Sequence, residues 1–221
     1  ASGQGQNAAQ DLQAGLAHLE KHIENARAFG LTPIVAVNAF PNDTQEELAQ
    51  VEAAAAKLGA RTARSTGFAE GGAGAIELAR VVAEVVDATD AAPPQPTFMY
   101  DASEPAEEKI RKVARAVYGA ADVAFAPAAV KSLERARALG HGELPVCIAK
   151  TQLSLSDDPK RPGRPEGFVV TVRDVRIAAG AGFLVPLTGD LMTMPGLPRE
   201  PAAKGVRLLP SGVIRGLMQN D

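Results

Sequence analysis

Two short apolar strands, each followed at once by a turn and a helix, constrain the fold of this chain more than any other feature. Residues 32–39 form a Val-rich apolar run, which is typical of a strand covered on both faces. Residues 61–66 predict a second strand, and apolar residues at three- and four-residue spacing predict helices over 44–58 and 75–86. Thr44 and Glu47 have the spacing of a capping box. The order strand, helix, strand, helix predicts a parallel sheet with right-handed crossovers.

The remaining sequence predicts further elements around this unit. Periodicity and turn residues indicate helices over 12–29, 105–118 and 128–139, strands over 97–100, 122–126, 145–150, 168–172 and 182–187, and a hairpin over 206–209 and 213–214. We expect an α/β fold with a mostly parallel sheet of about five strands and flanking helices, plus a smaller mixed α/β carboxy-terminal region. The expected domains are a disordered lead over residues 1–11, an α/β domain over 12–140 and a smaller mixed α/β domain over 141–221.

Composition and charge argue against two classes of partner. The chain is 46% hydrophobic and 22% charged, with a net charge of -3 and no concentrated run of Lys or Arg. These values are ordinary for a globular protein and predict neither a nucleic acid nor a membrane partner, and no apolar run reaches the ~18 residues of a membrane span. The single cysteine, Cys147, lies between Val146 and Ile148, which predicts an inert thiol in a buried strand. A cytoplasmic location is the default expectation.

Three patterns invite a functional interpretation but are more typical of structure. His18 and His22 lie four residues apart on a predicted helix with no obvious third ligand, so we interpret them as helix-surface histidines. Asp157 and Asp158 lie in a turn-rich loop, where turn capping is commoner than a catalytic carboxylate pair. The glycine-rich turn 71–74 opens a helix, but the chain contains no Gly-x-x-x-x-Gly-Lys-Ser/Thr phosphate loop. We therefore assign no metal-binding or catalytic residue.

Phe40 and Phe68 form the one constellation that points to a ligand. Each follows one of the two predicted parallel strands, and ligands bind at the carboxyl ends of such strands. A flat ring held between two aromatic faces needs a gap of about 7 Å, and neighbouring strands lie ~4.8 Å apart, so two such residues can clamp a ring with modest splay. The residues alone leave two interpretations open, an aromatic clamp and a pair that closes the top of the core.

Longer strings of residues carry a family resemblance. They are LEKHIEN (19–25), VNAFPNDT (37–44), FAEGG (68–72), AKTQLSLSDDP (149–159), AGAGF (179–183) and LTGDLMTMPGLP (187–198). In this order the strings closely resemble formate–tetrahydrofolate ligase, also called 10-formyltetrahydrofolate synthetase. The resemblance covers almost the whole chain from about Leu12 onward and is to the carboxy-terminal portion of the family, which lacks the P-loop domain.

The resemblance implies a role in one-carbon metabolism. Members of this family join formate to tetrahydrofolate with Mg-ATP through a formyl phosphate intermediate, and they are typically homotetramers. Their amino-terminal domain carries the P-loop and the catalytic groups, so the resemblance implies that this chain alone is inactive and needs such a domain as its partner. An alternative is a non-catalytic folate-binding or assembly module.

The resemblance also implies a set of binding residues. In the family an aromatic pair sandwiches the pterin of the folate or the adenine of the nucleotide, and the matching residues here are Phe40 and Phe68. Pro41 and the turn Glu70, Gly71 and Gly72 match residues that shape the floor and walls of that pocket. Many members carry Trp at the second aromatic position, whereas this chain contains no Trp, so we expect weaker ring binding.

Overall fold

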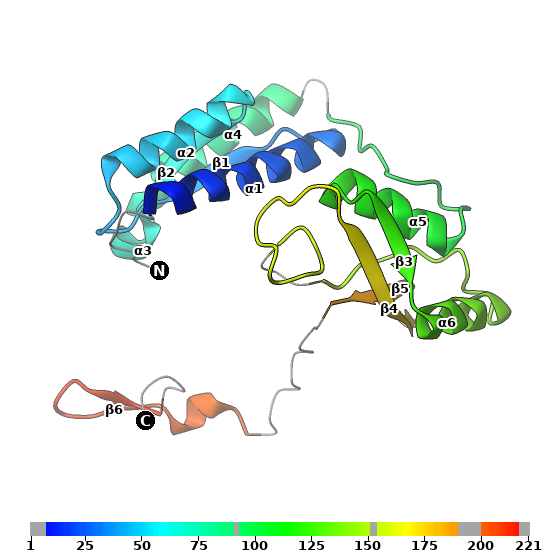
Figure 1. Cartoon of the computed structure of the whole chain (residues 1–221). Coiled ribbons are helices and arrows are strands. Elements are labelled where there is room, and N and C mark those ends of the chain that lie inside the picture. The colour runs from blue at the N-terminus through cyan, green and yellow to red at the C-terminus, as the bar shows by residue number, and fades with distance from the viewer. Residues whose placement is uncertain (1–7, 91–92, 151–153, 190–199, 217–221) are drawn as a thin grey trace. The chain divides into compact units, whose positions relative to one another are not determined.

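The computed structural model describes residues 8–90, 93–150, 154–189 and 200–216. The chain divides into a larger unit that ends at Leu191 and a smaller unit from Met192 onward. The larger unit contains two separate sheets with helices packed around them (Figure 1). The fold is therefore α/β, as the sequence predicts.

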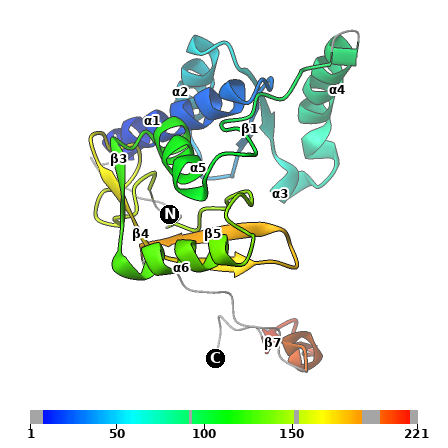
Figure 2. The same cartoon turned by 90° about the vertical axis from the view of Figure 1, so that its right-hand side faces the viewer.

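The first sheet is the predicted parallel pair. The elements in chain order are α1 (Ala8–Ala28), β1 (Ile34–Asn38), α2 (Gln45–Lys57), β2 (Arg61–Ser65), α3 (Gly67–Glu70), the 3-10 helix η1 (Ala73–Ala75) and α4 (Ile76–Asp90). β1 and β2 are parallel, with Ile34 opposite Arg61 and Asn38 opposite Ser65. In Figure 2 these strands lie between α2 and α4. The predicted strand, helix, strand, helix order is confirmed.

Helix α2 begins at the predicted capping box. The Glu47 amide donates to the Thr44 hydroxyl over 3.2 Å, and the Thr44 amide donates to the Glu47 carboxylate over 3.0 Å. These hydrogen bonds from Thr44 hold the pKa of Glu47 below its ordinary value. The cap starts the helix immediately after the turn that follows β1, and Ala55 of α2 packs against Ile23 of α1 in a small apolar core.

The second sheet belongs to the larger of the two apolar cores. Its elements are α5 (Ala106–Val113), the π-helix η2 (Ala114–Tyr118), β3 (Asp122–Phe125), α6 (Pro127–Ala138), β4 (Val169–Ala178) and β5 (Phe183–Thr188). β3 is parallel to β4, and β4 is antiparallel to β5. The most deeply buried side chains of this core include Ile110, Leu133, Val170, Val172 and Leu184.

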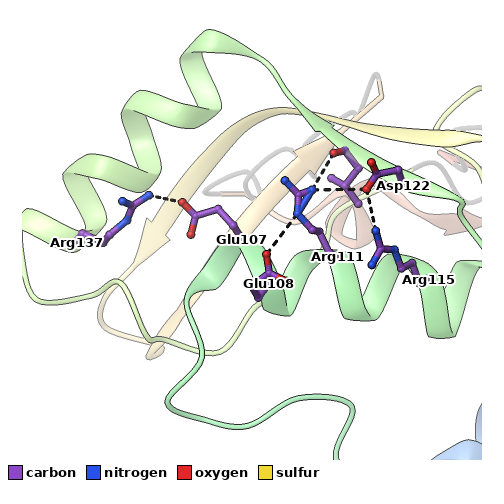
Figure 3. Close-up of polar contacts among 7 residues, drawn as sticks. Glu107, Glu108, Arg111, Arg115, Asp122 and Arg137 are labelled. Carbon is purple, nitrogen blue, oxygen red and sulfur yellow. Dashed lines mark hydrogen bonds and ion pairs between the residues drawn. The ribbon is translucent and has the colours of Figure 1, made fainter.

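Ion pairs fasten α5 to β3 and to α6 (Figure 3). Asp122, the first residue of β3, lies 3.6 Å from Arg111 and 3.2 Å from Arg115. On another part of α5, Glu107 pairs with Arg137 of α6. All these side chains are at least partly exposed, so the pairs orient the elements more than they stabilise them.

Three sequence predictions about strands are wrong or incomplete. In the larger unit the described strands form two sheets in place of the expected single sheet of about five strands. Residues 97–100 form no strand, and Phe98 is exposed. Residues 145–150 make only isolated bridges to β5, at Val146 and Ala149. β4 runs to Ala178, farther than the predicted end at residue 172.

The prediction that Cys147 is buried is also wrong. Its amide donates to the carbonyl of Leu184 over 2.9 Å, so the backbone does follow β5. Val146 and Ile148 pack against the main core, and successive side chains of an extended segment point to opposite sides. The Cys147 side chain therefore faces outward and is exposed.

The predicted domain boundaries stay predictions, and two observations bear on them. α1 begins at Ala8, so residues 8–11 are helical and not a disordered lead, while residues 1–7 lie outside the described residues. The division between 12–140 and 141–221 stays a prediction. β3 and β4 lie on either side of that division, yet they pair with each other.

The smaller unit is described over residues 200–216 and forms the predicted hairpin. It contains the 3-10 helix η3 (Ala202–Gly205) and the antiparallel strands β6 (Arg207–Leu208) and β7 (Ile214–Arg215). Across the described parts of both units, no helix has the length and apolar character needed to cross a membrane.

Lys109 joins α5 to two loops from inside the protein. Its side chain is fully buried. The ammonium group donates to the carbonyl of Ala102 over 2.7 Å and to the carbonyl of Glu143, and it lies 5.4 Å from the centre of the Tyr100 ring. A buried ammonium is tolerated only with such partners, so Lys109 fixes these segments against the helix.

We expect Lys109→Met to destabilise the chain by about 2–5 kcal/mol, because the helix loses the charge-assisted hydrogen bonds that hold the two loops at Ala102 and Glu143. Urea unfolding followed by circular dichroism measures the change. Lys131→Met, at an exposed position of α6, is the control and should change stability little. Equal stabilities of the two variants would contradict the role of Lys109.

Candidate functional site

Phe40 is held by a tight turn at the carboxyl end of β1. The pairing with β2 continues one residue past the strand, where the Ala39 amide donates to the Ser65 carbonyl over 2.9 Å. The Phe40 amide then donates to the Asp43 carboxylate over 2.8 Å, and the Asp43 amide donates to the Phe40 carbonyl over 3.0 Å. These two bonds close the turn on both sides of Pro41, so the backbone of Phe40 is fixed while its side chain stays outside the core.

Phe68 is presented by the short helix α3 directly after β2. The amides of Ala69 and Glu70 donate to the Thr66 carbonyl over 2.9 Å, and the Thr66 hydroxyl donates to the Glu70 carboxylate over 2.7 Å. The Glu70 side chain thus folds back onto Thr66, the residue that follows β2. Gly71 ends the helix with φ of 60°, a conformation that glycine adopts without strain.

The two rings meet at the carboxyl ends of the neighbouring parallel strands β1 and β2. The ring centres of Phe40 and Phe68 are 5.5 Å apart and the ring planes are inclined by 57°. Phe40 is 46% exposed and Phe68 is 83% exposed, so neither ring closes the top of the core. Because a flat ring between them needs about 7 Å, a ligand would have to separate and align the rings.

The pair forms an open platform and not a closed pocket. Two cavities of the larger unit lie elsewhere, one of 530 Å³ lined by residues of α6 and β4 and one of 280 Å³ around Asp157 and Asp158. Pro41, Gly71 and Gly72 are exposed at the two turns that carry the rings. The platform therefore offers aromatic faces with accessible backbone beside them.

The other patterns singled out in the sequence make local contacts. His18 and His22 contact each other, with their Nε2 atoms 3.2 Å apart, and burial, His22 and Lys150 lower the pKa of His18, which favours its neutral form. The Asp158 carboxylate accepts from the Lys160 amide over 2.9 Å, which is a turn contact. Within the ranges that the structure describes, no three His, Cys, Asp or Glu side chains are grouped so that they could hold a metal.

Sequence reasoning missed the residues that support the rings, namely Asp43, Thr66 and Gly74. The Thr66 amide donates to the Gly74 carbonyl over 3.0 Å, and a Cβ added to Gly74 would lie 2.6 Å from the Thr66 carbonyl carbon. An Asp three residues after Phe40 is a turn signal that the sequence does contain. The close approach of Gly74 to Thr66 has no comparable signal, because it depends on how η1 folds back.

A parallel β-α-β unit with an exposed aromatic pair at its carboxyl edge defines an α/β protein with an aromatic platform on its surface. The family model described as formate–tetrahydrofolate ligase matches residues 2–218. The chain therefore belongs to the formate–tetrahydrofolate ligase family, which confirms the resemblance drawn from the sequence.

Two curated relatives show how much of such a protein this chain represents. It is 55% identical over 210 residues to a formate–tetrahydrofolate ligase of Myxococcus xanthus (strain DK1622), covering 95% of this chain and 38% of the relative. It is 48% identical over 207 residues to a formate–tetrahydrofolate ligase of Methylobacterium nodulans, covering 93% of this chain and 37% of the relative. The chain thus spans less than half the length of these relatives.

We expect Gly74→Ala to displace α3 and destabilise the chain by about 1–3 kcal/mol, because the new methyl group overlaps the backbone of Thr66. Gly72→Ala is the matched control, since its φ is -61° and a Cβ there meets nothing within 4 Å. Thermal unfolding measures stability, and the ring proton shifts of Phe40 and Phe68 report their contact. Identical behaviour of both variants would contradict the close fit at Gly74.

Proposed function

We propose that this chain is the part of a formate–tetrahydrofolate ligase that holds a flat heteroaromatic ring, the pterin of tetrahydrofolate or the adenine of ATP, between Phe40 and Phe68. The observation that carries the proposal is the exposed contact of the two rings at the carboxyl edge of β1 and β2. Apolar rings with this much exposure gain free energy when a ligand covers them.

Ring binding needs only a local rearrangement. The turn at Phe40 and the helix at Phe68 fix the two backbones, so rotation about side-chain bonds is what opens the gap. Rotamer changes of exposed side chains are fast. Because the unliganded rings already contact each other, a ligand exchanges one aromatic contact for two, and the net gain is smaller than for a preformed slot.

The turn residues give the pocket its polar edge in this proposal. One carboxylate oxygen of Glu70 accepts a hydrogen bond from the Thr66 hydroxyl. The Glu70 carboxylate can also accept hydrogen bonds from the amino and ring N–H groups of a pterin. Gly71 and Gly72 carry no side chain that would shield their backbone, and Pro41 supplies an apolar wall. Apolar faces with a few polar groups at the rim are the usual composition of a small-molecule site.

We expect Phe40→Ala and Phe68→Ala each to weaken binding of tetrahydrofolate by about 1–3 kcal/mol, roughly 5- to 150-fold in Kd, since each removes one stacking face. Isothermal titration under anaerobic conditions gives the affinities, with ATP as a parallel ligand. Phe98→Ala is the control, because Phe98 is 81% exposed and lies outside the aromatic pair. Unchanged affinity in both site variants would exclude the clamp.

The complete reaction requires more than this chain in our proposal. ATP-dependent ligation of formate to tetrahydrofolate, with Mg²⁺ and a formyl phosphate intermediate, is assigned to a P-loop-containing amino-terminal domain acting with this chain in a cytoplasmic homo-oligomer. The relatives' additional length supports such a division of labour, because the chain covers only 38% of the Myxococcus protein. The chain by itself is then inactive in ligation.

We expect 10-formyltetrahydrofolate to form only when this chain is combined with the remaining portion of the ligase, because neither part then holds the full set of reacting groups. Absorbance of the acid-converted product measures the rate with formate, Mg-ATP and tetrahydrofolate. Each part alone is the control. Folate binding without product in any mixture would favour the alternative, a non-catalytic folate-binding or assembly module.

A further inference from the structure

The two faces of the first sheet are covered unequally. Arg64 of β2 pairs with Glu52 of α2, so its face of the sheet lies toward α2, whereas Arg61 pairs with Glu84 of α4 on the opposite face. Ala36 and Ala63 are register partners and share the α4 face. Ala63 is 2% exposed, but Ala36 of β1 is classed as exposed. α4 therefore covers β2 and leaves this face of β1 open.

The outer edge of β1 is open as well. Along a strand, the backbone N–H and C=O groups of alternate residues point to the same side. Because the Ala39 amide donates to the Ser65 carbonyl, Val35 and Val37 also direct their backbone groups to β2. Ile34, Ala36 and Asn38 then direct theirs to the other side, and within the described residues β1 pairs with β2 alone. Edge strands usually carry a Lys, a Pro or a bulge against unwanted pairing, and β1 has none of these between its ends.

An apolar helix surface adjoins this open strand. At helical spacing, α4 turns Leu78, Val81 and Val85 toward the sheet and divides its outer surface into two flanks. One flank is charged, with Glu77, Arg80, Glu84 and Asp87. The other is apolar, with Ile76, Ala79, Val82, Ala83 and Val86, of which Ile76 is 48%, Val82 41% and Val86 50% exposed.

The apolar flank lies on the β1 side of the helix. Glu84 pairs with Arg61 from the charged flank, and α4 contacts both strands. For a right-handed helix that returns along β2 after a right-handed crossover, the apolar flank is the one toward β1. We call the open edge of β1, the exposed Ala36 and this flank of α4 the β1 edge surface.

Within the ranges that the structure describes, no segment covers the β1 edge surface. By the same right-handed rule, a parallel strand that followed α4 would lie against the open edge of β1. Instead, Thr97 lies beside the residues that precede β1, since its amide donates to the Phe29 carbonyl over 3.1 Å. The chain then continues to α5. The position that the topology reserves for a third parallel strand is thus not taken by these residues.

We infer that the β1 edge surface receives a β-strand, parallel to β1 and apolar on its α4 side, from the portion of the ligase that this chain does not span. The inference rests on the proposed function, and the relatives have the necessary length because the chain covers only 38% and 37% of them. Such a strand completes a three-stranded doubly wound sheet and covers Val82 and Val86. Its carboxyl end lies beside Phe40, so the residues that follow it reach the aromatic pair.

Amide hydrogen exchange tests the inference with an internal control. In the chain alone, the amides of Val35 and Val37 are bonded to β2 and should exchange slowly, while those of Ala36 and Asn38 should exchange fast. Addition of the remaining portion of the ligase should slow Ala36 and Asn38 at least about tenfold and leave Val35 and Val37 nearly unchanged. Equal protection of all four amides before mixing, or no change at Ala36 and Asn38 after it, would overturn the inference.

A pair of variants at one position tests the edge directly. Ala36→Pro removes an outward N–H and should weaken association with the remaining portion at least about tenfold, whereas Ala36→Ser keeps the N–H and should associate normally. Val86→Glu on the apolar flank should also weaken association, and Glu77→Gln on the charged flank should not. Circular dichroism checks that each variant is folded. If Ala36→Pro does not fold, Val86→Glu still tests the surface.

The two proposals fail in distinguishable ways. If Phe40→Ala and Phe68→Ala both bind tetrahydrofolate with unchanged affinity, the clamp is excluded, but the association data still stand. Normal association of both Ala36→Pro and Val86→Glu, or no association of the unmodified chain, removes the strand acceptor whatever the folate affinity.

Discussion

The parallel pairing of β1 with β2 is the constraint on which the rest of the site depends. Its register sets Asn38 opposite Ser65, so both chains leave the sheet at the same level and deliver Phe40 and Phe68 to each other. The same register decides which side chains face α2 and which face α4. A slip by one residue would exchange those faces and separate the aromatic residues, so the pairing determines both the platform and the packing beneath it.

The sequence predicts this unit well because its signals are local. The Val-rich run of β1, the capping box at Thr44 and the spacing of apolar residues in α2 each specify their element without reference to the rest of the chain. The contact of Phe40 with Phe68 then follows from the rule that parallel strands end at one edge. What local signals do not contain is the state of the rings, which touch at 57° and leave no slot.

The predictions that fail are those that need a distant partner. Residues 97–100 have the composition of a strand, but in the part of the chain that the structure describes they join no sheet and stay irregular. Cys147 has apolar neighbours, yet its exposure depends on which side of the chain Val146 presents to the core beside β5. The close approach of Gly74 to Thr66 likewise follows from tertiary folding. Which strand a segment pairs with, and which of its side chains face the core, are properties of the assembled sheet and not of a short segment.

The same limit gives the exposed surfaces of the first sheet a meaning. The composition of β1 predicts a strand covered on both faces, but Ala36 and Asn38 are exposed. Two-stranded sheets are at best marginally stable by themselves, so this sheet needs the packing of helices such as α2 and α4 against it. The composition of β1 suits deeper burial than the structure provides, and β1 lies beside the apolar flank of α4. We expect this combination where a sheet is continued by residues from another part of the protein. Local sequence then describes the complete sheet more closely than the chain can form by itself.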